Sequence, residues 1–219
     1  MEKVPFDDLS LPLDSYGEGS VGVLLAHGAG THRGHDGVVG IARALQERGL
    51  SVVTFDYPHV VQGRKVPGSP KKSLAAHQAV VEFVRPRFDQ LIMAGRSFGG
   101  RLSTMLSADG VPADALVALG YPLHPPGKPD KLRIDHLPDM TAPALFHQGT
   151  NDALARAELV KEHLEPVGKV AWLDGGSHSM RVKGRSDAET FGLLADRTRS
   201  WLQDLGIGRL GSGPSDTIK

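Results

Sequence analysis

The sequence contains no cysteine, no excess of charge of either sign and no long hydrophobic run. Without cysteine, the protein can form neither disulfide bonds nor cysteine–zinc sites, which is consistent with a reducing compartment. The 25 basic and 25 acidic side chains cancel, so no overall field attracts the protein to nucleic acid or to an anionic membrane. The apolar runs are too short to span a bilayer.

Targeting and nucleotide-binding signals are also missing. Residues 1–20 are acidic and lack the apolar core of a signal peptide, so we expect a cytoplasmic protein with no membrane or nucleic-acid partner. Two G-x-G-x-x-G matches, at 17–22 and 206–211, do not join a strand to a helix and therefore do not indicate dinucleotide binding. No phosphate-binding G-x-x-x-x-G-K-[ST] motif occurs.

Short apolar runs alternate with amphipathic segments along the chain. The runs, bounded by Gly, Pro and Asp, predict buried strands at 20–26, 51–57, 90–94, 115–119, 144–147 and 169–173. Helical spacing of apolar residues predicts helices at 38–45, directly after Ser97, and from the capping box at Ser186 to 205. This alternation predicts an α/β fold with a mostly parallel central sheet and helices on both faces.

The length of 219 residues suits one domain. We expect a single domain over residues 1–206, followed by a flexible tail at 207–219. Two segments have little strand or helix pattern. The Gly-, Pro- and Lys-rich segment 59–73 is expected to be an exposed loop, and the proline-rich segment 120–142 is expected to cross the sheet edge as a minimal lid.

The segment Gly95-Arg-Ser-Phe-Gly99 matches G-x-S-x-G, and an apolar strand precedes it while a helical pattern follows. In this arrangement a serine lies at the apex of a sharp strand-to-helix turn, which larger neighbours in place of the glycines would obstruct. The context therefore predicts that Ser97 is a nucleophile rather than part of an ordinary glycine-rich turn.

A serine hydroxyl needs a base, and the base needs an acid that orients it. His178 follows the strand at 169–173 and is the predicted base, and Asp152 follows the strand at 144–147 and is the predicted acid. Asp174 also ends a strand, but it lies close to His178 in sequence and suits a turn better. The weaker candidates in the 120–142 segment are Asp130, Asp135 and Asp139.

Two backbone N–H groups are predicted to form an oxyanion hole, those of Phe98 and Ala29, with Gly30 as the alternative to Ala29. Arg96 and Arg101 flank Ser97 and are compatible either with recognition of an anionic acyl group or with plain surface charge. Candidates for lining the substrate are His27, Gly30, Arg96, Leu123 and His124.

We expect no metal and no cofactor. His32, His35 and Asp36 have metal-binding chemistry, but they lie on a glycine-rich loop without the fixed face that a helix would provide. The proposed chemistry of Ser97 requires none.

The chain order Ser97, Asp152, His178 is that of α/β-hydrolases. The sequence resembles small, dienelactone-hydrolase-like members of that superfamily over most of residues 20–205. Five segments resemble a narrower branch, which includes testis-expressed protein 30 and the hydrolase-like subunit of the NSL histone-acetyltransferase complex: HGAG at 27, GRSFGGR at 95, YPLHPPGKP at 121, QGTND at 148 and GSHS at 176. The resemblance implies a hydrolase fold and the same three site residues, but no substrate.

Three functions are compatible with these residues. The first is a serine hydrolase acting on a small-molecule ester, thioester or related acyl bond through an acyl-enzyme. The second is a serine peptidase that uses the same three residues. The third is a binding or scaffold protein that keeps the fold without turnover, as the resemblance to a chromatin-complex subunit suggests. The sequence does not indicate an oligomeric state.

Overall fold

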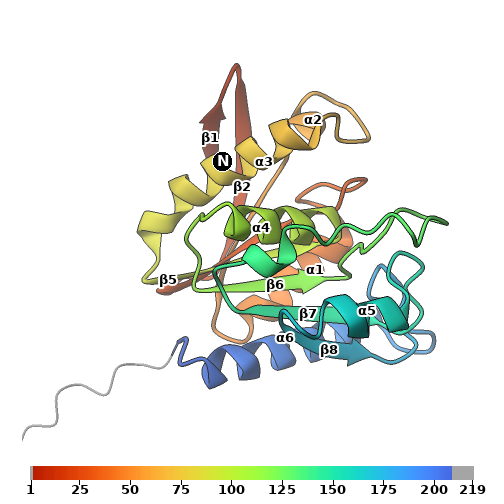
Figure 1. Cartoon of the computed structure of the whole chain (residues 1–219). Coiled ribbons are helices and arrows are strands. Elements are labelled where there is room, and N and C mark those ends of the chain that lie inside the picture. Colours follow the sequence, from red (N-terminus) through yellow and green to blue (C-terminus); the bar gives the residue numbers. More distant parts are fainter. Residues whose placement is uncertain (1, 209–219) are drawn as a thin grey trace, which may run out of the picture.

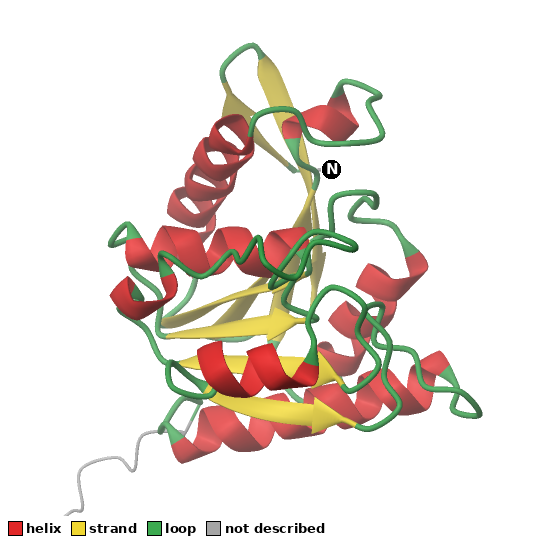
Figure 2. Cartoon of the chain, turned by 45° about the vertical axis from the view of Figure 1, so that its right-hand side comes forward, coloured by secondary structure: helices red, strands yellow, loops and turns green. Residues whose placement is uncertain are grey.

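A computed structural model describes residues 2–208, which form one eight-stranded sheet with helices on both faces (Figures 1 and 2). The strand order is β1-β2-β4-β3-β5-β6-β7-β8. No helix within these residues combines the length and the apolar character needed to span a membrane.

Six strands are parallel, and each coincides with a predicted apolar run. The parallel strands are β3 (Val21–Ala26), β4 (Ser51–Phe55), β5 (Gln90–Arg96), β6 (Ala115–Leu119), β7 (Ala144–Gly149) and β8 (Lys169–Leu173). The residues of β4, β6 and β7 are all buried, as expected for strands covered by helices on both sides. The predicted α/β fold is therefore confirmed.

The first two strands were not predicted. β1 (Lys3–Phe6) and β2 (Leu9–Tyr16) form an antiparallel hairpin, and β2 continues the sheet antiparallel to β4. Both strands contain a proline, which is tolerated near the edge of a sheet but weakens a strand pattern in the sequence. Leu11 and Leu13 nevertheless alternate with more exposed residues and enter the core.

Each face of the sheet is covered by its own helices. α1 (Asp36–Gln46) and α6 (Asp187–Asp204) pack together on one face, and the predicted capping box at Ser186 and Glu189 begins α6. On the other face lie α3 (Pro70–Val84), α4 (Phe98–Ala108) and the short α5 (Ala157–His163), which was not predicted.

The expectation of an exposed loop at 59–73 is wrong at both ends of that segment. α2 (Pro58–Val61) occupies its start, and α3 begins at Pro70, with the Ser69 side chain accepting the Lys71 N–H as a helix cap. Proline at the first helical position is favourable, although it reads as a loop signal in the sequence.

A short 3₁₀ turn (Arg85–Arg87) follows α3, and another (Leu137–Asp139) lies within the 120–142 segment.

The predicted boundary of the tail also needs correction. Ile207 is buried in the core, and its N–H donates to the carbonyl of Leu202 at 2.9 Å. The folded region therefore extends at least to residue 208. The rest of the predicted tail, residues 209–219, lies outside the described residues.

Candidate active site

Ser97 lies at the turn between β5 and α4, at the carboxyl edge of the parallel strands. Its φ of +47° and ψ of −111° are unusual for a residue with a side chain, and its N–H donates to the carbonyl of Leu119 at 3.0 Å. Such a conformation costs on the order of 1–3 kcal/mol and persists where surrounding structure enforces it. The predicted sharp turn at Ser97 is present.

Two glycines allow this turn. A Cβ at Gly95 would lie 2.4 Å from the nitrogen of Gly100, and a Cβ at Gly99 would lie 2.6 Å from the carbonyl oxygen of Ala26. Because both contacts are with backbone atoms, neither could be relieved by a side-chain rotation. The close approach of α4 to the sheet therefore requires glycine at both positions.

The structure brings the three predicted site residues into one hydrogen-bonded row. His178 Nε2 lies 2.8 Å from Ser97 Oγ, and His178 Nδ1 lies 2.9 Å and 3.0 Å from the two carboxylate oxygens of Asp152. Since the carboxylate only accepts, Nδ1 carries a proton, and in the neutral ring Nε2 can accept from the serine hydroxyl. The Asp152 side chain is fully buried, whereas the His178 side chain is 27% exposed.

The Asp152 carboxylate is held by further donors. The Gln148 side-chain amide donates to it at 2.6 Å, and the N–H of Leu154 donates at 2.8 Å. The Gln148 carbonyl oxygen in turn accepts the N–H of Tyr121 at 3.0 Å. The sequence analysis named the QGTND segment, which begins at Gln148, but did not assign Gln148 a role. These bonds fix the orientation of the carboxylate toward His178.

The competing carboxylates lie elsewhere. Asp174, in the turn after β8, accepts a bond from the hydroxyl of Thr150 in the turn after β7, which agrees with the turn role preferred for it. Three other carboxylates are exposed: Asp130, Asp135 and Asp139. In the described part of the chain, the carboxylate that His178 hydrogen-bonds is that of Asp152.

The loop after β3 passes beside Ser97, since a Cβ at Gly28 would lie 3.8 Å from Ser97 Cβ. The carbonyl of Gly28 accepts from His27 Nδ1 at 2.7 Å and from the N–H and hydroxyl of Thr31 at 3.2 Å and 3.1 Å. This carbonyl belongs to the same planar peptide group as the N–H of Ala29. The three donors therefore fix the direction of the predicted oxyanion donor.

Buried side chains from neighbouring elements hold this loop in place. His27 Nε2 accepts the N–H of Tyr57 at 3.2 Å, and His59 Nε2 donates to the carbonyl of Ala29 at 3.1 Å. Arg33 forms an ion pair with Asp56. Burial lowers the pKa of His27 to about 4, so its ring is neutral near pH 7 and can accept at one nitrogen while it donates at the other.

The Phe98 N–H is the first of α4. The first N–H groups of a helix lack partners within it and favour negative charge nearby. The site thus combines a serine–histidine–aspartate row with N–H groups next to the serine.

Comparison with known proteins identifies the fold family. Residues 19–203 match the family described as "Alpha/beta hydrolase domain". The chain belongs to this family. Among solved structures, XC6422 from Xanthomonas campestris, described as an α/β serine hydrolase without lid, is 23% identical with a TM-score of 0.73, over 91% of this chain and 93% of that one.

Two esterases have a similar fold at lower identity. Est1E from Butyrivibrio proteoclasticus is 15% identical with a TM-score of 0.72, over 93% of this chain and 97% of that one. Esterase 2 from Thermogutta terrifontis, solved after phosphoramylation by tabun, is 16% identical with a TM-score of 0.71, over 93% of this chain and 94% of that one.

The α/β-hydrolase structure buries three of the side chains predicted to line the substrate. His27 and Leu123 are 0% exposed, and His124 is 2% exposed. Leu123 belongs to the core, and His27 holds the loop from behind. These three therefore offer almost no surface to a ligand in this structure. Gly30, in contrast, is exposed, and the space around its α-carbon is open.

Arg96 lies against the loop that carries His178. Its guanidinium donates to the carbonyl of Ser179 at 3.2 Å and also approaches Gly37 at the start of α1. The pKa of Arg96 is lowered, mainly by burial and then by the positive charge of Arg181. Arg96 thus links the turn at Ser97 to the residue after His178.

His32 and His35 do not converge as metal ligands would. Their rings are edge to face with centroids 6.2 Å apart, and His35 Nδ1 accepts the N–H of Gly37 as the cap of α1. Within residues 2–208, no group of three or more His, Asp or Glu side chains is arranged to hold a metal ion.

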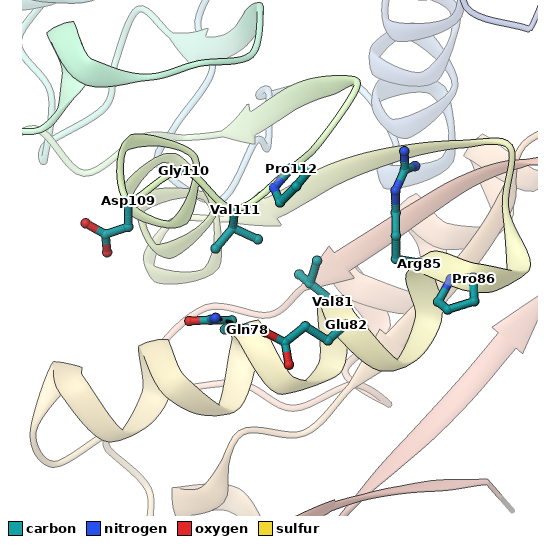
Figure 3. A pocket seen from close by; sticks show the side chains of 9 residues that line it. All are labelled: Gln78, Val81, Glu82, Arg85, Pro86, Asp109, Gly110, Val111 and Pro112. Atoms are coloured by element: carbon teal, nitrogen blue, oxygen red, sulfur yellow. Dashed lines mark hydrogen bonds between the residues drawn. The ribbon is translucent and has the colours of Figure 1, made fainter.

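A groove of about 470 Å³ lies away from Ser97, between the ends of α3 and α4 (Figure 3). Because these helices run antiparallel to the strands, the groove is at the opposite edge of the sheet. Gln78 and Glu82 bond to each other there, and Arg85 pairs with Asp114 nearby. These polar groups already have partners, so the groove lacks the convergent free donors of a ligand site.

Proposed function

We propose that the protein is a serine hydrolase that cleaves an ester, thioester or related acyl bond of a small molecule. The observation that carries this proposal is the hydrogen-bonded row of Ser97, His178 and Asp152, with the serine on a strained turn at the carboxyl edge of the sheet. Membership of the α/β-hydrolase family and the similarity to two esterases support it.

The proposed reaction has two halves. Ser97 Oγ attacks the substrate carbonyl while its proton passes to His178 Nε2, and the resulting oxyanion accepts bonds from the N–H groups of Phe98 and Ala29. Collapse breaks the bond to the leaving group, which takes the proton from His178. Water then attacks the acyl carbonyl and gives a proton to His178, and collapse breaks the bond to Ser97 Oγ, which takes that proton back as the carboxylic acid leaves.

The buried carboxylate of Asp152 has an orienting role in this scheme. It holds the imidazole in the tautomer whose Nε2 can accept, and it stabilises the positive charge that His178 gains in each half-reaction. The bonds from Gln148 and Leu154 keep the carboxylate in place. None of these steps needs a metal or an organic cofactor.

A fluorophosphonate probe tests the nucleophile directly. We expect the probe to label the wild-type protein and to leave Ser97→Ala unlabelled. Ser103→Ala is a matched control, since it removes a hydroxyl from α4 that bonds to the carbonyl of Gly99. That variant should be labelled normally. Folded wild-type protein that does not react would instead favour a binding or scaffold role, as in the chromatin-complex branch.

A substrate panel then separates the reaction classes. We expect hydrolysis of esters and thioesters of short acyl chains, lost in Ser97→Ala. Cleavage of peptides in preference to these esters would support the peptidase alternative. We also propose that the protein is cytoplasmic, which fractionation of the cells that make it would test. Its membership of the narrower branch is a further proposal, which comparison with more sequences would test.

A further inference from the structure

Gln148 connects the candidate acid to the neighbouring strand of the sheet. It lies one residue before the end of β7, and its side chain is completely buried. Its carbonyl oxygen accepts the N–H of Tyr121 at 3.0 Å, and its amide nitrogen donates to Asp152 Oδ2 at 2.6 Å. Because the N–H of Tyr121 can only donate, the amide cannot be turned the other way round, and its NH₂ group must face the carboxylate.

The carboxylate of Asp152 has few donors around it. Oδ2 accepts from Gln148 and lies 2.9 Å from His178 Nδ1, while Oδ1 accepts the N–H of Leu154 at 2.8 Å and lies 3.0 Å from the same Nδ1. The Asp152 side chain is 0% exposed, so bulk water supplies no donor. Among the described residues, Gln148 is therefore the one side chain besides His178 that donates to Asp152.

A buried carboxylate depends on such donors to stay ionised. Hydrogen bonds to the charged form favour that form, whereas burial without donors favours uptake of a proton. Without the Gln148 amide, Oδ2 would keep only the donor of His178. Asp152 and His178 together would then bind a proton more readily, whichever of the two carries it. Such a proton removes either the base or the negative charge that supports it, so the reaction would stop at a higher pH.

The other end of the amide is bonded to a segment that touches His178. A Cβ at Gly120 would lie 2.7 Å from the carbonyl oxygen of His178, so the backbone before Tyr121 lies directly against the loop that carries the base. The N–H of Tyr121 is the one that Gln148 accepts. The amide of Gln148 thus lies between Asp152 and the backbone on which the His178 loop packs, and it couples the placement of the acid to that of the base.

Further ionisable groups lie on the strands and loops around Asp152 and His178. They are Tyr121 (bonded to the Arg133 carbonyl), His147 (Thr198 hydroxyl), Asp174 (Thr150 hydroxyl), Arg96 (Ser179 carbonyl), Arg181 (Asp187 carboxylate) and the exposed Arg156. All of them are unchanged in the Gln148 variants described below. Differences between these variants and the wild type therefore report the loss of the Gln148 amide.

We propose that Gln148 is a positioning residue of the hydrolase: its amide keeps the Asp152 carboxylate ionised and directed at His178, and thereby sets the pH above which the base works. Since Gln148 is completely buried, it acts through Asp152 and not on the substrate. This inference rests on the proposed function, which gives Asp152 and His178 their roles.

Gln148→Met tests the proposal, because it removes both bonding groups and keeps a side chain of similar length. We expect kcat on a neutral ester near about pH 8 to fall about tenfold, with KM within about twofold of the wild type. The acid limb of the plot of kcat/KM against pH should move toward higher pH by at least about half a pH unit. A lower kcat with an unmoved acid limb would overturn the proposal, since a merely structural role predicts that result.

Ser107→Ala is the matched control for loss of a buried bond. The Ser107 hydroxyl accepts the N–H groups of Thr141 and Ala142 at 3.1 Å and 3.3 Å, at the end of α4 far from Ser97. This variant also leaves buried backbone groups unpaired, but its acid limb should coincide with that of the wild type. An acid limb that moved equally in Ser107→Ala and Gln148→Met would contradict a specific role of Gln148.

Gln148→Glu should show the opposite pH dependence. It keeps an acceptor for the Tyr121 N–H, so it also serves if Gln148→Met does not fold. When protonated, its carboxyl can donate to Asp152 as the amide does, and when ionised it repels that carboxylate. Relative to the wild type, its kcat/KM should be at least about tenfold lower near about pH 8.5 than near about pH 6, whereas Gln148→Met should lose more near about pH 6. The same pH dependence in both variants would overturn the proposal.

A titration that needs no turnover separates this inference from the proposed function. The ring C–H signals of His178 are followed by NMR in Ser97→Ala and are assigned by their loss in His178→Gln. Adding Gln148→Met should move the titration midpoint to higher pH by at least about half a pH unit. An unchanged midpoint would overturn the role of Gln148, whatever the wild type hydrolyses. A shifted midpoint in a protein that hydrolyses no acyl substrate would support that role and count against the proposed function.

Discussion

Two loops meet at Ser97, and they are held in different ways. The loop after β3, which carries the proposed oxyanion donor Ala29, is fixed by buried side chains such as His27 and His59. The loop after β8, which carries His178, is held by its own backbone bonds, by Arg96 and by the apolar side chain of Met180 in the core, and not by buried polar side chains of this kind. The difference fits their proposed tasks, because an oxyanion hole works by being rigid before reaction, whereas the base must exchange protons at a partly open surface.

The largest expected effect is a loss of folding stability at low pH, caused by His27 in the loop after β3. Burial lowers the pKa of His27 to about 4 from an ordinary value of 6.5. The unfolded chain therefore takes up the proton first as the pH falls. His27 should lower the stability by about 3 kcal/mol between about pH 6.5 and about pH 4, and its contribution should be constant below that pH.

Urea unfolding between pH 7 and pH 4 measures this loss. His27→Asn is the matched variant, because its amide nitrogen takes the place of Nδ1 and still donates to Gly28, but it does not titrate. The free energy of unfolding of this variant should depend less steeply on pH. Identical pH dependence in the two proteins would show that the ring of His27 does not resist protonation. His77 and His147, whose pKa values burial lowers to about 3, act in the same direction in both proteins.

The next effect concerns the direction of the Ala29 N–H. His27→Gln keeps an acceptor for the Tyr57 N–H but loses the donor to the Gly28 carbonyl, whereas His27→Asn keeps that donor. We expect kcat of His27→Gln to fall about tenfold, because loss of a whole oxyanion donor costs about 100-fold to 1,000-fold and here it is only loosened. His27→Asn should stay within about threefold of the wild type.

Steady-state kinetics on a neutral ester separate kcat from KM for this pair. Since an oxyanion forms only in the transition state, KM should change little. A rise in KM at constant kcat would instead assign His27 to substrate binding, which is the role predicted from the sequence.

The sequence predicted the three central residues of the candidate site, because Ser97, Asp152 and His178 each follow the end of a parallel strand. Strand ends of this kind meet at one edge by topology alone. The residues that hold the site were not predicted in their roles. His27 was expected to line the substrate, and its support of the Gly28 peptide depends on which way a loop side chain turns.

The features missed elsewhere have related causes. The β1–β2 hairpin and α3 contain prolines that weaken the local pattern, although an edge position and a first helical turn tolerate them. The 120–142 segment takes an irregular path over α4, where His136 Nε2 lies 2.9 Å from the Thr104 hydroxyl. No periodicity in the sequence reports such a path, because it is set by tertiary contacts such as the bond from Tyr121 to Arg133.

The smallest effect concerns the loop that carries His178. Arg96→Met removes the bond from a partly buried guanidinium to the Ser179 carbonyl. We expect kcat to fall about threefold to tenfold with little change in KM, since the loop keeps its backbone bonds and the imidazole is misplaced only slightly. Arg96→Lys should recover part of the loss, because the ammonium group can still donate.

Arg181→Met provides the contrast on the same loop. Arg181 pairs with Asp187 at 3.0 Å, but its side chain is 63% exposed, and such pairs contribute little to stability. The kcat and the melting temperature of Arg181→Met should therefore match those of the wild type. If Arg181→Met lowered kcat as much as Arg96→Met, the loop would depend on its surface contacts. The bond from Arg96 to the Ser179 carbonyl would then not be what positions His178.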